Sequence, residues 1–469
     1  GDHRDLHSFP TRRSSDLRTI GTDTQLVEVK EAAWKLPESI GETLSAFMNH
    51  TGGILILGLS ERRGFTPVEG FNARRLHNAL LSACDTITPP CRPDIYILPF
   101  EGAEVVAAVI PALEPDLRPA YITDRGPVGG SFIRTGDGDK RLTHYEVDRM
   151  CESRMQPVWD TEHVSEASVT DLDAAVLKTM IERSRAMTPS VFGGMAGEEI
   201  LVKTGVLAEG AGRLVPTLGG LLAAGVYPQQ FFPRLNIVLT VRGTGETCSI
   251  NGPVPCMVET AVNLLAERLR TADGFVYPLR ACREAVVNAL QHRDYSPEGR
   301  GSQVRIDLFD DRLEFLNPGG LFRAAVFNRQ IHGLAALRNA NLTRILECTP
   351  SPDADGRPGA VLEPGTQGLL LIDEALEVAG RPRAVVHDWV SAVSLVFFRE
   401  ERIVHWTDFE YDLTTALSER DSIALTEIVR CSGLSRSTVL AKLRRMIDAG
   451  LIERTEPLHS PRQRYRLSS

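Results

Sequence analysis

The segment LRACREAVVNALQHRDY, Leu279 to Tyr295, most strongly limits what this chain can fold into. Glu284 and Asn288 are four residues apart, so a helix places both side chains on one face. Small apolar residues give the same helix a face that can pack: Ala281, Ala285, Val286 and Ala289. A carboxylate beside a carboxamide can hold a hydrated Mg²⁺, and the carboxylate can polarise a water for attack on a phosphate. The alternative is a packed helix with a hydrogen-bonded polar pair.

A second motif, DRLEFLNPGG, follows this helix in the chain. A strand is predicted from Asp311 to Leu316, and the turn after it contains Asn317, Gly319 and Gly320. Glycines at such a turn let the backbone approach a ligand closely. The chain contains no G-x-x-x-x-G-K-[ST] loop, so we expect an ATP site without a P-loop and exclude a conventional helicase motor.

Together, E-x-x-x-N-A, N-P-G-G and a later altered G-T-x-G resemble the GHKL-like ATP-binding fold of gyrase, histidine kinases and MutL. The closest resemblance is to the branch found behind Schlafen AlbA-type domains in bacterial regulators, some of which carry a helicase RecG-like label. Further matching residues form the R-E-x-x-x-N-A-x-x-H-R-D-Y and R-N-x-x-L motifs: Arg283, Ala289, His292, Arg293, Asp294, Tyr295, Arg338, Asn339 and Leu342.

The resemblance implies roles for residues around ATP and Mg²⁺. Glu284 matches the general base, and Asn288 matches the Mg²⁺ ligand. Asn317 stands where the wider superfamily has an aspartate that reads the adenine amine, and its uncharged carbonyl is expected to bind more weakly. The remaining ligand-binding positions are Gly319, Gly320, Gly365, Thr366 and Gly368, the last three near the phosphates at a helix start. Two roles remain open for His292 and Arg293, namely contact with phosphate or stabilisation of the fold.

A Pro-, Asp- and Gly-rich segment from Thr349 to Pro364 is predicted to lack regular structure. It lies where the resembled fold carries a mobile lid over the nucleotide. A disordered insertion is the alternative.

The region from Thr24 to Glu152 alternates predicted strands and helices, with an amphipathic helix over Glu38 to His50. It resembles the Schlafen AlbA-type domain, with these matches: Ala46, Phe47, Asn49, Gly52, Gly53, Arg118, Pro119, Ile133, Arg134 and Gly136. The resemblance implies nucleic-acid binding, with Arg118, Arg134 and Lys140 as phosphate contacts. Relatives of this family include nucleases, so an alternative is a metal-dependent nuclease site that contains Glu28 and Lys30. We favour a solvated or salt-bridged Glu28 over this nuclease site.

The last segment, residues 413–469, reads as helix, turn, helix and two strands. It resembles bacterial winged helix-turn-helix regulators in G-L-S-x-x-T-V and A-G-L-I-x-R. Nine basic and three acidic residues lie between Arg430 and Arg466, whereas the whole chain has a net charge of −9. We expect double-stranded DNA to contact Arg436, Ser437 and Thr438 at the start of the second helix and Arg462 and Arg464 on the wing. A protein-docking module is the alternative.

We therefore expect α/β and α+β domains in this order: an adapter-derived artefact or a basic tail (1–17), an AlbA-type domain (24–152), a linker (153–170), a connecting region (171–275), a GHKL-like α/β sandwich (276–400) and a winged helix (413–469). No apolar run is long enough for a membrane span. The eight scattered cysteines fit a reducing cytoplasm.

We predict a homodimeric transcriptional regulator whose DNA affinity depends on ATP, with slow ATP hydrolysis as an option. The alternatives are a DNA-processing ATPase, a nuclease or phage-defence effector, and a nucleotide site that binds nothing.

Overall fold

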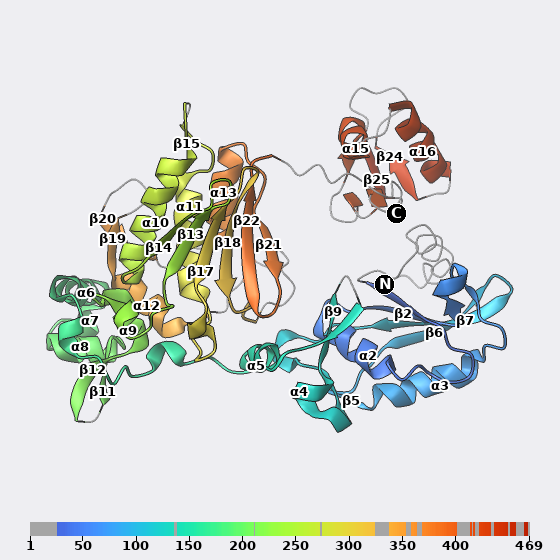
Figure 1. Ribbon diagram of the computed structural model, residues 1–469, viewed down its shortest axis with the longest axis horizontal. Coiled ribbons are helices and arrows are strands. Elements are labelled where there is room, and N and C mark those ends of the chain that lie inside the picture. Colours follow the sequence, from blue (N-terminus) through green and yellow to red (C-terminus); the bar gives the residue numbers. More distant parts are fainter. Residues whose placement is uncertain are drawn as a thin grey trace. The chain divides into compact units, whose positions relative to one another are not determined.

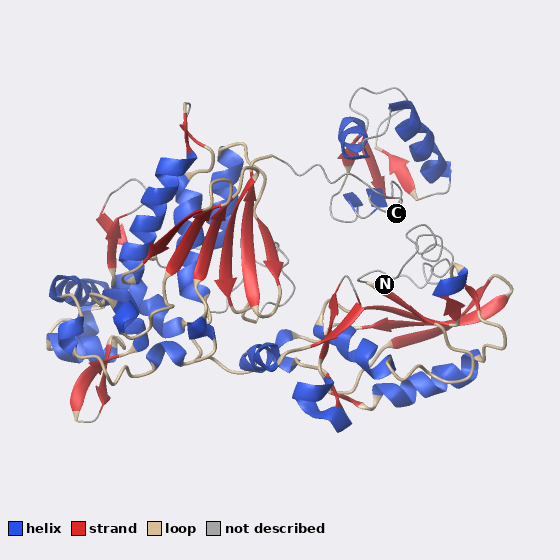
Figure 2. Ribbon diagram, in the orientation of Figure 1, coloured by secondary structure: helices blue, strands red, loops and turns tan. Residues whose placement is uncertain are grey.

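The computed structural model describes residues 26–135, 138–210, 212–272, 274–323, 337–352, 358–363, 368–400, 413–414, 416–417, 422–432, 436–448, 451–455 and 464–467. The fold is mixed α/β and multidomain, as predicted (Figures 1 and 2). One compact unit comprises Gly1–Ala112, Ala120–Arg141 and Arg402–Ser469, and the other Leu113–Pro119 and Leu142–Glu401. In the described part of the chain, no helix is both long and apolar enough to cross a bilayer. The predicted artefact, residues 1–17, lies outside the described residues.

The first unit contains a four-stranded sheet in the order β1-β2-β7-β6. Its strands are β1 (Val27–Lys30), β2 (Gly53–Leu57), β6 (Asp94–Phe100) and β7 (Ala103–Ile110). β1 runs parallel to β2, and the other neighbours are antiparallel. Two amphipathic helices, α2 (Ile40–Asn49) and α3 (Ala73–Cys84), lie along one face of the sheet (Figure 2). The predicted helix over residues 38–50 is therefore present as α2.

Asn49, one of the residues that match the Schlafen AlbA-type pattern, lies at the end of α2. Its Nδ2 donates to the carbonyl oxygens of Ala120 (2.8 Å) and Phe132 (2.9 Å), and its Oδ1 accepts from the Ala120 N–H (2.6 Å). Buried amide groups need such partners. Asn49 therefore joins α2 to β9 (Phe132–Thr135), which pairs with β10 (Gly138–Arg141). Smaller elements complete this part: β3 (Leu59–Ser60), β4 (Thr66–Pro67), β5 (Ile87–Thr88), β8 (Tyr121–Ile122) and α4 (Gly126–Gly130).

The C-terminal module has its own core of buried apolar residues, among them Ile428, Val439 and Leu443. Its helices are α15 (Leu425–Ser432) and α16 (Arg436–Asp448). Three short antiparallel strands lie in the order β23-β25-β24: β23 (Ile423–Ala424), β24 (Ile452–Arg454) and β25 (Arg464–Leu467). α15 begins only at Leu425, because Ile423 and Ala424 pair with β25.

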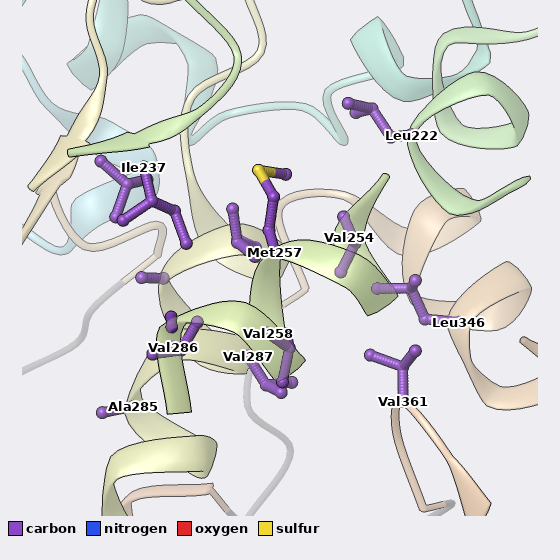
Figure 3. Packing of buried hydrophobic residues seen from close by; sticks show 14 of the residues in the cluster. Leu222, Ile237, Val254, Met257, Val258, Ala285, Val286, Val287, Leu346 and Val361 are labelled. Atoms are coloured by element: carbon purple, nitrogen blue, oxygen red, sulfur yellow. The ribbon is translucent and has the colours of Figure 1, made fainter. Parts of the chain in front are cut away.

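The second unit is built on a six-stranded sheet in the order β14-β13-β17-β18-β22-β21. Its strands are β13 (Ile237–Val241), β14 (Glu246–Ile250), β17 (Val304–Leu308), β18 (Arg312–Pro318), β21 (Val385–Asp388) and β22 (Ala392–Phe398). The helices α10 (Val254–Leu269), α11 (Leu279–His292) and α13 (Gly368–Val378) pack beside one another and cover one face of the sheet (Figure 1). Apolar side chains of α10 and α11 pack against each other in the core of this unit. Figure 3 shows four of them: Met257, Val258, Val286 and Val287.

The rest of the second unit is mostly helical. The helices are α5 (His144–Glu152), α6 (Ala174–Met187), α7 (Pro189–Phe192), α8 (Gly197–Lys203), α9 (Leu218–Ala224) and α12 (Ala340–Cys348). Two hairpins accompany them: β11 (Leu207–Gly210) with β12 (Arg213–Pro216), and β15 (Arg270–Thr271) with β16 (Gly274–Phe275).

The prediction that residues 349–364 lack regular structure is wrong. β19 (Pro350–Pro352) and β20 (Pro358–Ala360) form an antiparallel hairpin there. Arg183 donates to the Gly359 carbonyl (2.7 Å), and Val361 after the hairpin is 1% exposed. Its side chain lies in the core, as Figure 3 shows. The described part of this segment is therefore anchored to the fold.

Candidate nucleotide site

The helix that carries the E-x-x-x-N-A motif is α11, within the bounds that its sequence predicts. Pro278 precedes its first turn, and its apolar face is buried against α10, α13 and β18. Glu284 and Asn288 lie on a half-buried face that meets the start of α13. A Cβ on Gly368 would stand 2.3 Å from Asn288 Nδ2 and 2.6 Å from Glu284 Oε1. Glycine at position 368 thus lets the α13 N-terminus reach the polar pair directly.

The carboxyl group of Glu284 is partly removed from water. Burial raises its pKa, while Arg283 and Arg280 oppose that rise and Glu363 adds to it. Arg283 also donates to the carbonyl oxygens of Ala360 and Val361 at 3.2 and 3.3 Å, which holds α11 against the end of the β19–β20 hairpin. A carboxylate with a raised pKa is a stronger base, as a group that accepts a proton from water requires.

Asn317 occupies the end of β18 on the helix-covered face. Leu313, Phe315 and Asn317 alternate with more exposed neighbours, so the three side chains point to the same side of the sheet. Asn317 is 7% exposed, and its Oδ1 has no hydrogen-bond partner among the described residues. A buried acceptor without a partner is rare because it costs about 1–3 kcal/mol of desolvation. This oxygen is suited to accept a hydrogen bond from a ligand amine.

The atoms that a side chain at Gly319 or Gly320 would meet belong to the protein's own chain. Gly319 has φ +87°, and a Cβ there would stand 2.4 Å from Arg338 Nη1. A Cβ on Gly320 would stand 2.4 Å from the Val390 carbonyl oxygen. Both glycines are therefore needed for the close approach of the protein's own chain.

Arg293 and Tyr295 of the H-R-D-Y motif bond to the protein's own backbone. The Arg293 guanidinium is 1% exposed and donates to the carbonyl oxygens of Gly299 (3.1 Å) and Ser302 (2.6 Å). The Tyr295 hydroxyl donates to the Leu290 carbonyl (2.7 Å), which closes the end of α11. Both Arg293 bonds use Nη2, and the burial of this side chain keeps it away from solvent.

A buried ionic network joins this motif to α5. Asp294 accepts from Arg149 (2.8 Å) and from the Tyr145 hydroxyl (2.7 Å). Glu152 lies 3.1 Å from Arg149 and 3.6 Å from Arg338, and Arg338 donates to the Gly320 carbonyl (2.9 Å). The network therefore reaches from α5 to the turn after β18.

The sequence analysis missed the contribution of α5. The available signal was the spacing of Tyr145, Arg149 and Glu152, which places three polar side chains on one face of a short helix. Their partners Asp294 and Arg338 are distant in sequence. Only the tertiary fold brings the two groups together.

His292 is expected to make the stability of the second unit sensitive to acid. Burial, reinforced by Arg338, lowers its pKa to about 4, below the ordinary value of 6.5. Between those values the unfolded chain binds a proton that the folded chain excludes, so this residue's contribution to stability is present above pH 6.5 and is lost as the pH falls toward 4. We expect His292→Gln to show a smaller loss of unfolding free energy between pH 6.5 and 4 than the wild type. Denaturant titrations across this range test it, and equal losses in both proteins would contradict it.

A small cavity beside Gly320 is lined by charged side chains of the second unit: Arg118, Arg149, Arg338 and Asp388. Arg118 Nε donates to the Leu113 carbonyl (2.9 Å), and burial lowers the pKa of its guanidinium while Asp388 raises it. Asp388 accepts from the Leu321 and Val390 N–H groups at 3.2 and 3.1 Å. Arg118 is therefore half-buried in a cavity wall, and its role as a phosphate contact stays a prediction.

Arg134 is also not an exposed DNA contact. Its side chain is 3% exposed and forms ion pairs with Glu28 and, at 2.9 Å, with Asp139. The favoured alternative for Glu28 agrees with the structure, since Glu28 is buried and also pairs with Lys30 at 2.5 Å. Among the described residues no group of three His, Cys, Asp or Glu side chains could hold a metal ion. Arg134 and Glu28 are thus held in a buried structural network, while Lys140 remains exposed on β10.

The C-terminal site residues are only partly described. Arg436, Ser437 and Thr438 form the first turn of α16, as predicted, and their side chains lie outside the described part. Arg464 lies on the central strand β25, where its guanidinium donates to Ser422 Oγ and to the Ser422 carbonyl, both at 2.8 Å. Arg462, like Gly365 and Thr366 of the nucleotide motif, lies outside the described residues.

Two family models match separate parts of the chain. One is described as "Schlafen, AlbA_2" and matches residues 23–143, and the other is described as "Putative ATP-dependent DNA helicase recG C-terminal" and matches residues 301–397. The second range includes Asn317, whereas Glu284 and Asn288 precede it. The chain thus contains an AlbA_2-type domain and a RecG-like C-terminal domain, which associate it with DNA binding and with ATP-related function.

Similar solved structures include two bacterial proteins. The crystal structure of the DIP2311 protein from Corynebacterium diphtheriae is 16% identical, covers 99% of each chain and has a TM-score of 0.39. The N-terminal domain of a protein from Nitrosomonas europaea, titled "Putative ATP-dependent DNA Helicase RecG-related Protein", is 25% identical, covers 29% of this chain and 94% of that chain, and has a TM-score of 0.23. These TM-scores are too low to establish a shared overall fold. No curated protein gives a significant match.

Proposed function

We propose that this chain is a DNA-binding transcriptional regulator whose affinity for DNA changes when the second unit binds ATP. The observation that carries the proposal is the meeting of Glu284 and Asn288 with the start of α13 at Gly368. The unpartnered oxygen of Asn317 supports it, because adenine has an amine that such an acceptor can bind. A GHKL-like ATP site requires these same polar groups.

The residues that would hold ATP and Mg²⁺ can be named. Asn317 would accept from the adenine amine, and Asn288 offers a carboxamide oxygen of the kind that Mg²⁺ takes directly or through water. The N-terminus of α13, with Gly365, Thr366 and Gly368, would face the phosphates. Bound Mg²⁺ would neutralise phosphate charge, while Glu284 would orient a water molecule for slow hydrolysis.

The ionic network of Asp294, Arg149, Glu152 and Arg338 gives ATP binding a physical route to the rest of the chain. Arg338 binds the carbonyl of Gly320, three residues beyond Asn317, and α5 supplies Arg149 and Glu152. In the chain, α5 follows directly after β10 of the first unit. A change at the turn after β18 would therefore act on the segment that leads to the AlbA-type domain.

The C-terminal module serves in this proposal as a winged helix-turn-helix, with α16 as the recognition helix and Arg462 on the wing. Its excess of basic over acidic residues suits phosphate contacts. A cytoplasmic homodimer would match the two-fold symmetry of palindromic DNA sites.

Measuring DNA affinity with and without ATP tests the proposal. For the wild type, fluorescence anisotropy with duplex DNA should give affinities that differ at least fivefold between saturating ATP with Mg²⁺ and no nucleotide, as a coupling of about 1 kcal/mol requires. Asn317→Leu should bind DNA with one affinity under both conditions. Equal wild-type affinities would contradict the proposal, and DNA cleavage during the assay would favour the nuclease alternative.

A further inference from the structure

The outer face of α3 carries positive charge. Between Ala73 and Cys84 the helix contains two arginines and no carboxylate. Its apolar residues Ala73, Leu76, Leu80 and Cys84 are buried toward the sheet. The exposed positions are Arg74, Arg75, Asn78, Leu81 and Ser82. Arg74, Asn78 and Ser82 are spaced four residues apart, so they form one continuous row along the helix.

The position of the two arginines is unfavourable for the helix itself. Both lie in the first turn, where the partial positive charge of the helix dipole repels a cation. Asn72 caps this end by accepting from the Arg75 N–H at 3.0 Å. Within the described chain, no carboxylate lies at ion-pair distance from either guanidinium. The charge on this turn thus lacks a stabilising role inside the described domain.

The nearest carboxylates in sequence flank the helix and leave its outer face basic. Glu69 precedes the cap, and Asp85 follows the last turn, where it pairs with Arg92 at 3.1 Å. The helix between them exposes the two arginine guanidinium groups, Asn78 and Ser82. Asn78 Oδ1 lies 3.2 Å from His77 Nδ1, and the Ser82 hydroxyl donates to the Asn78 carbonyl at 3.2 Å. These are the side chains that contact phosphates and base edges in duplex DNA.

We propose that this face of α3 contacts duplex DNA, with Arg74 and Arg75 on the phosphates and Asn78 and Ser82 toward the groove. The inference rests on the proposed DNA-binding function and gives it a surface in the AlbA-type domain. It replaces the contact expected from Arg134, which the structure places in a buried ion-pair network. The C-terminal module would bind DNA independently of it.

Salt-dependent DNA binding by the full chain tests the proposal. Each arginine that neutralises a phosphate contributes about 0.9 to the slope of log affinity against log salt. Arg74→Ala/Arg75→Ala should therefore lower the slope by about 2 and weaken duplex binding about tenfold. Arg74→Lys/Arg75→Lys should keep most of the slope, because the charge remains. Arg62→Ala/Arg63→Ala removes two exposed arginines of the same domain outside α3 and should leave both values unchanged.

Several results would overturn the proposal. An unchanged slope in Arg74→Ala/Arg75→Ala would show that α3 does not contact phosphates. An equal loss in Arg62→Ala/Arg63→Ala would show a general charge effect, and a loss confined to single-stranded DNA of the same length would exclude duplex recognition. Absence of any wild-type DNA binding would overturn the proposed function as well, which distinguishes that failure from a failure of α3 alone.

Discussion

Replacing Asp294 with alanine is expected to lower the unfolding free energy of the second unit by about 3–5 kcal/mol. The Asp294 side chain is fully buried, and it accepts from Arg149, from the Tyr145 hydroxyl and from the Ser296 N–H and hydroxyl groups. Its loss would leave the buried Arg149 with Glu152 as its remaining carboxylate partner. Denaturant-dependent hydrogen exchange of peptides from α11 measures this unit without assuming that the whole chain unfolds in one step.

Asp311→Ala is the matched control for this measurement. Asp311 pairs with Arg312 at 3.0 Å, but its side chain is 69% exposed, so its removal should cost less than about 1 kcal/mol. Similar losses in the two variants would contradict a special role for the buried network. A large loss confined to Asp294→Ala would support the network as the element that holds α5 on the second unit.

Glu284→Gln is expected to reduce ATP hydrolysis by at least about 100-fold, the usual effect of removing a general base. Glutamine keeps the size of the side chain but cannot accept a proton from water. ATP affinity should remain within a few-fold of the wild type, because the adenine contact at Asn317 is unchanged. Phosphate release under single-turnover conditions measures the rate, and calorimetry measures the affinity.

Glu377→Gln makes the same chemical change near the end of α13, where the side chain is 70% exposed. Hydrolysis by this control should equal that of the wild type. If Glu284→Gln hydrolyses ATP at the wild-type rate, Glu284 is not the base. If it loses affinity together with the rate, Glu284 acts mainly in holding the ligand.

The elements with strong local patterns could be predicted from the sequence. The helix from Leu279 to His292 has a regular apolar face, and the strand before Asn317 alternates buried and exposed residues. The β19–β20 hairpin could not be predicted in this way, because its prolines oppose strand formation and its stability comes from contacts with distant residues such as Arg183.

The functions of single residues were less predictable than the elements that carry them. Arg134 is a long cation that the sequence pattern places on a surface, yet Glu28 and Asp139 hold it in the interior. The sequence predicted that Gly319 and Gly320 leave space for a ligand. In the structure, Arg338 and the Val390 backbone lie so close to them that a larger side chain would not fit. In each case the deciding partner is far away in the chain, so no local motif could reveal it.

Calorimetric titration of the chain with ATP and Mg²⁺ tests the central claim most directly, namely that α11, the end of β18 and the start of α13 form a nucleotide site. We predict saturable binding with one ATP per chain for the wild type. Asn317→Leu, which removes the buried oxygen and keeps a similar volume, should bind at least tenfold more weakly. No heat of binding from the wild type, or equal affinities for the two proteins, would contradict the claim.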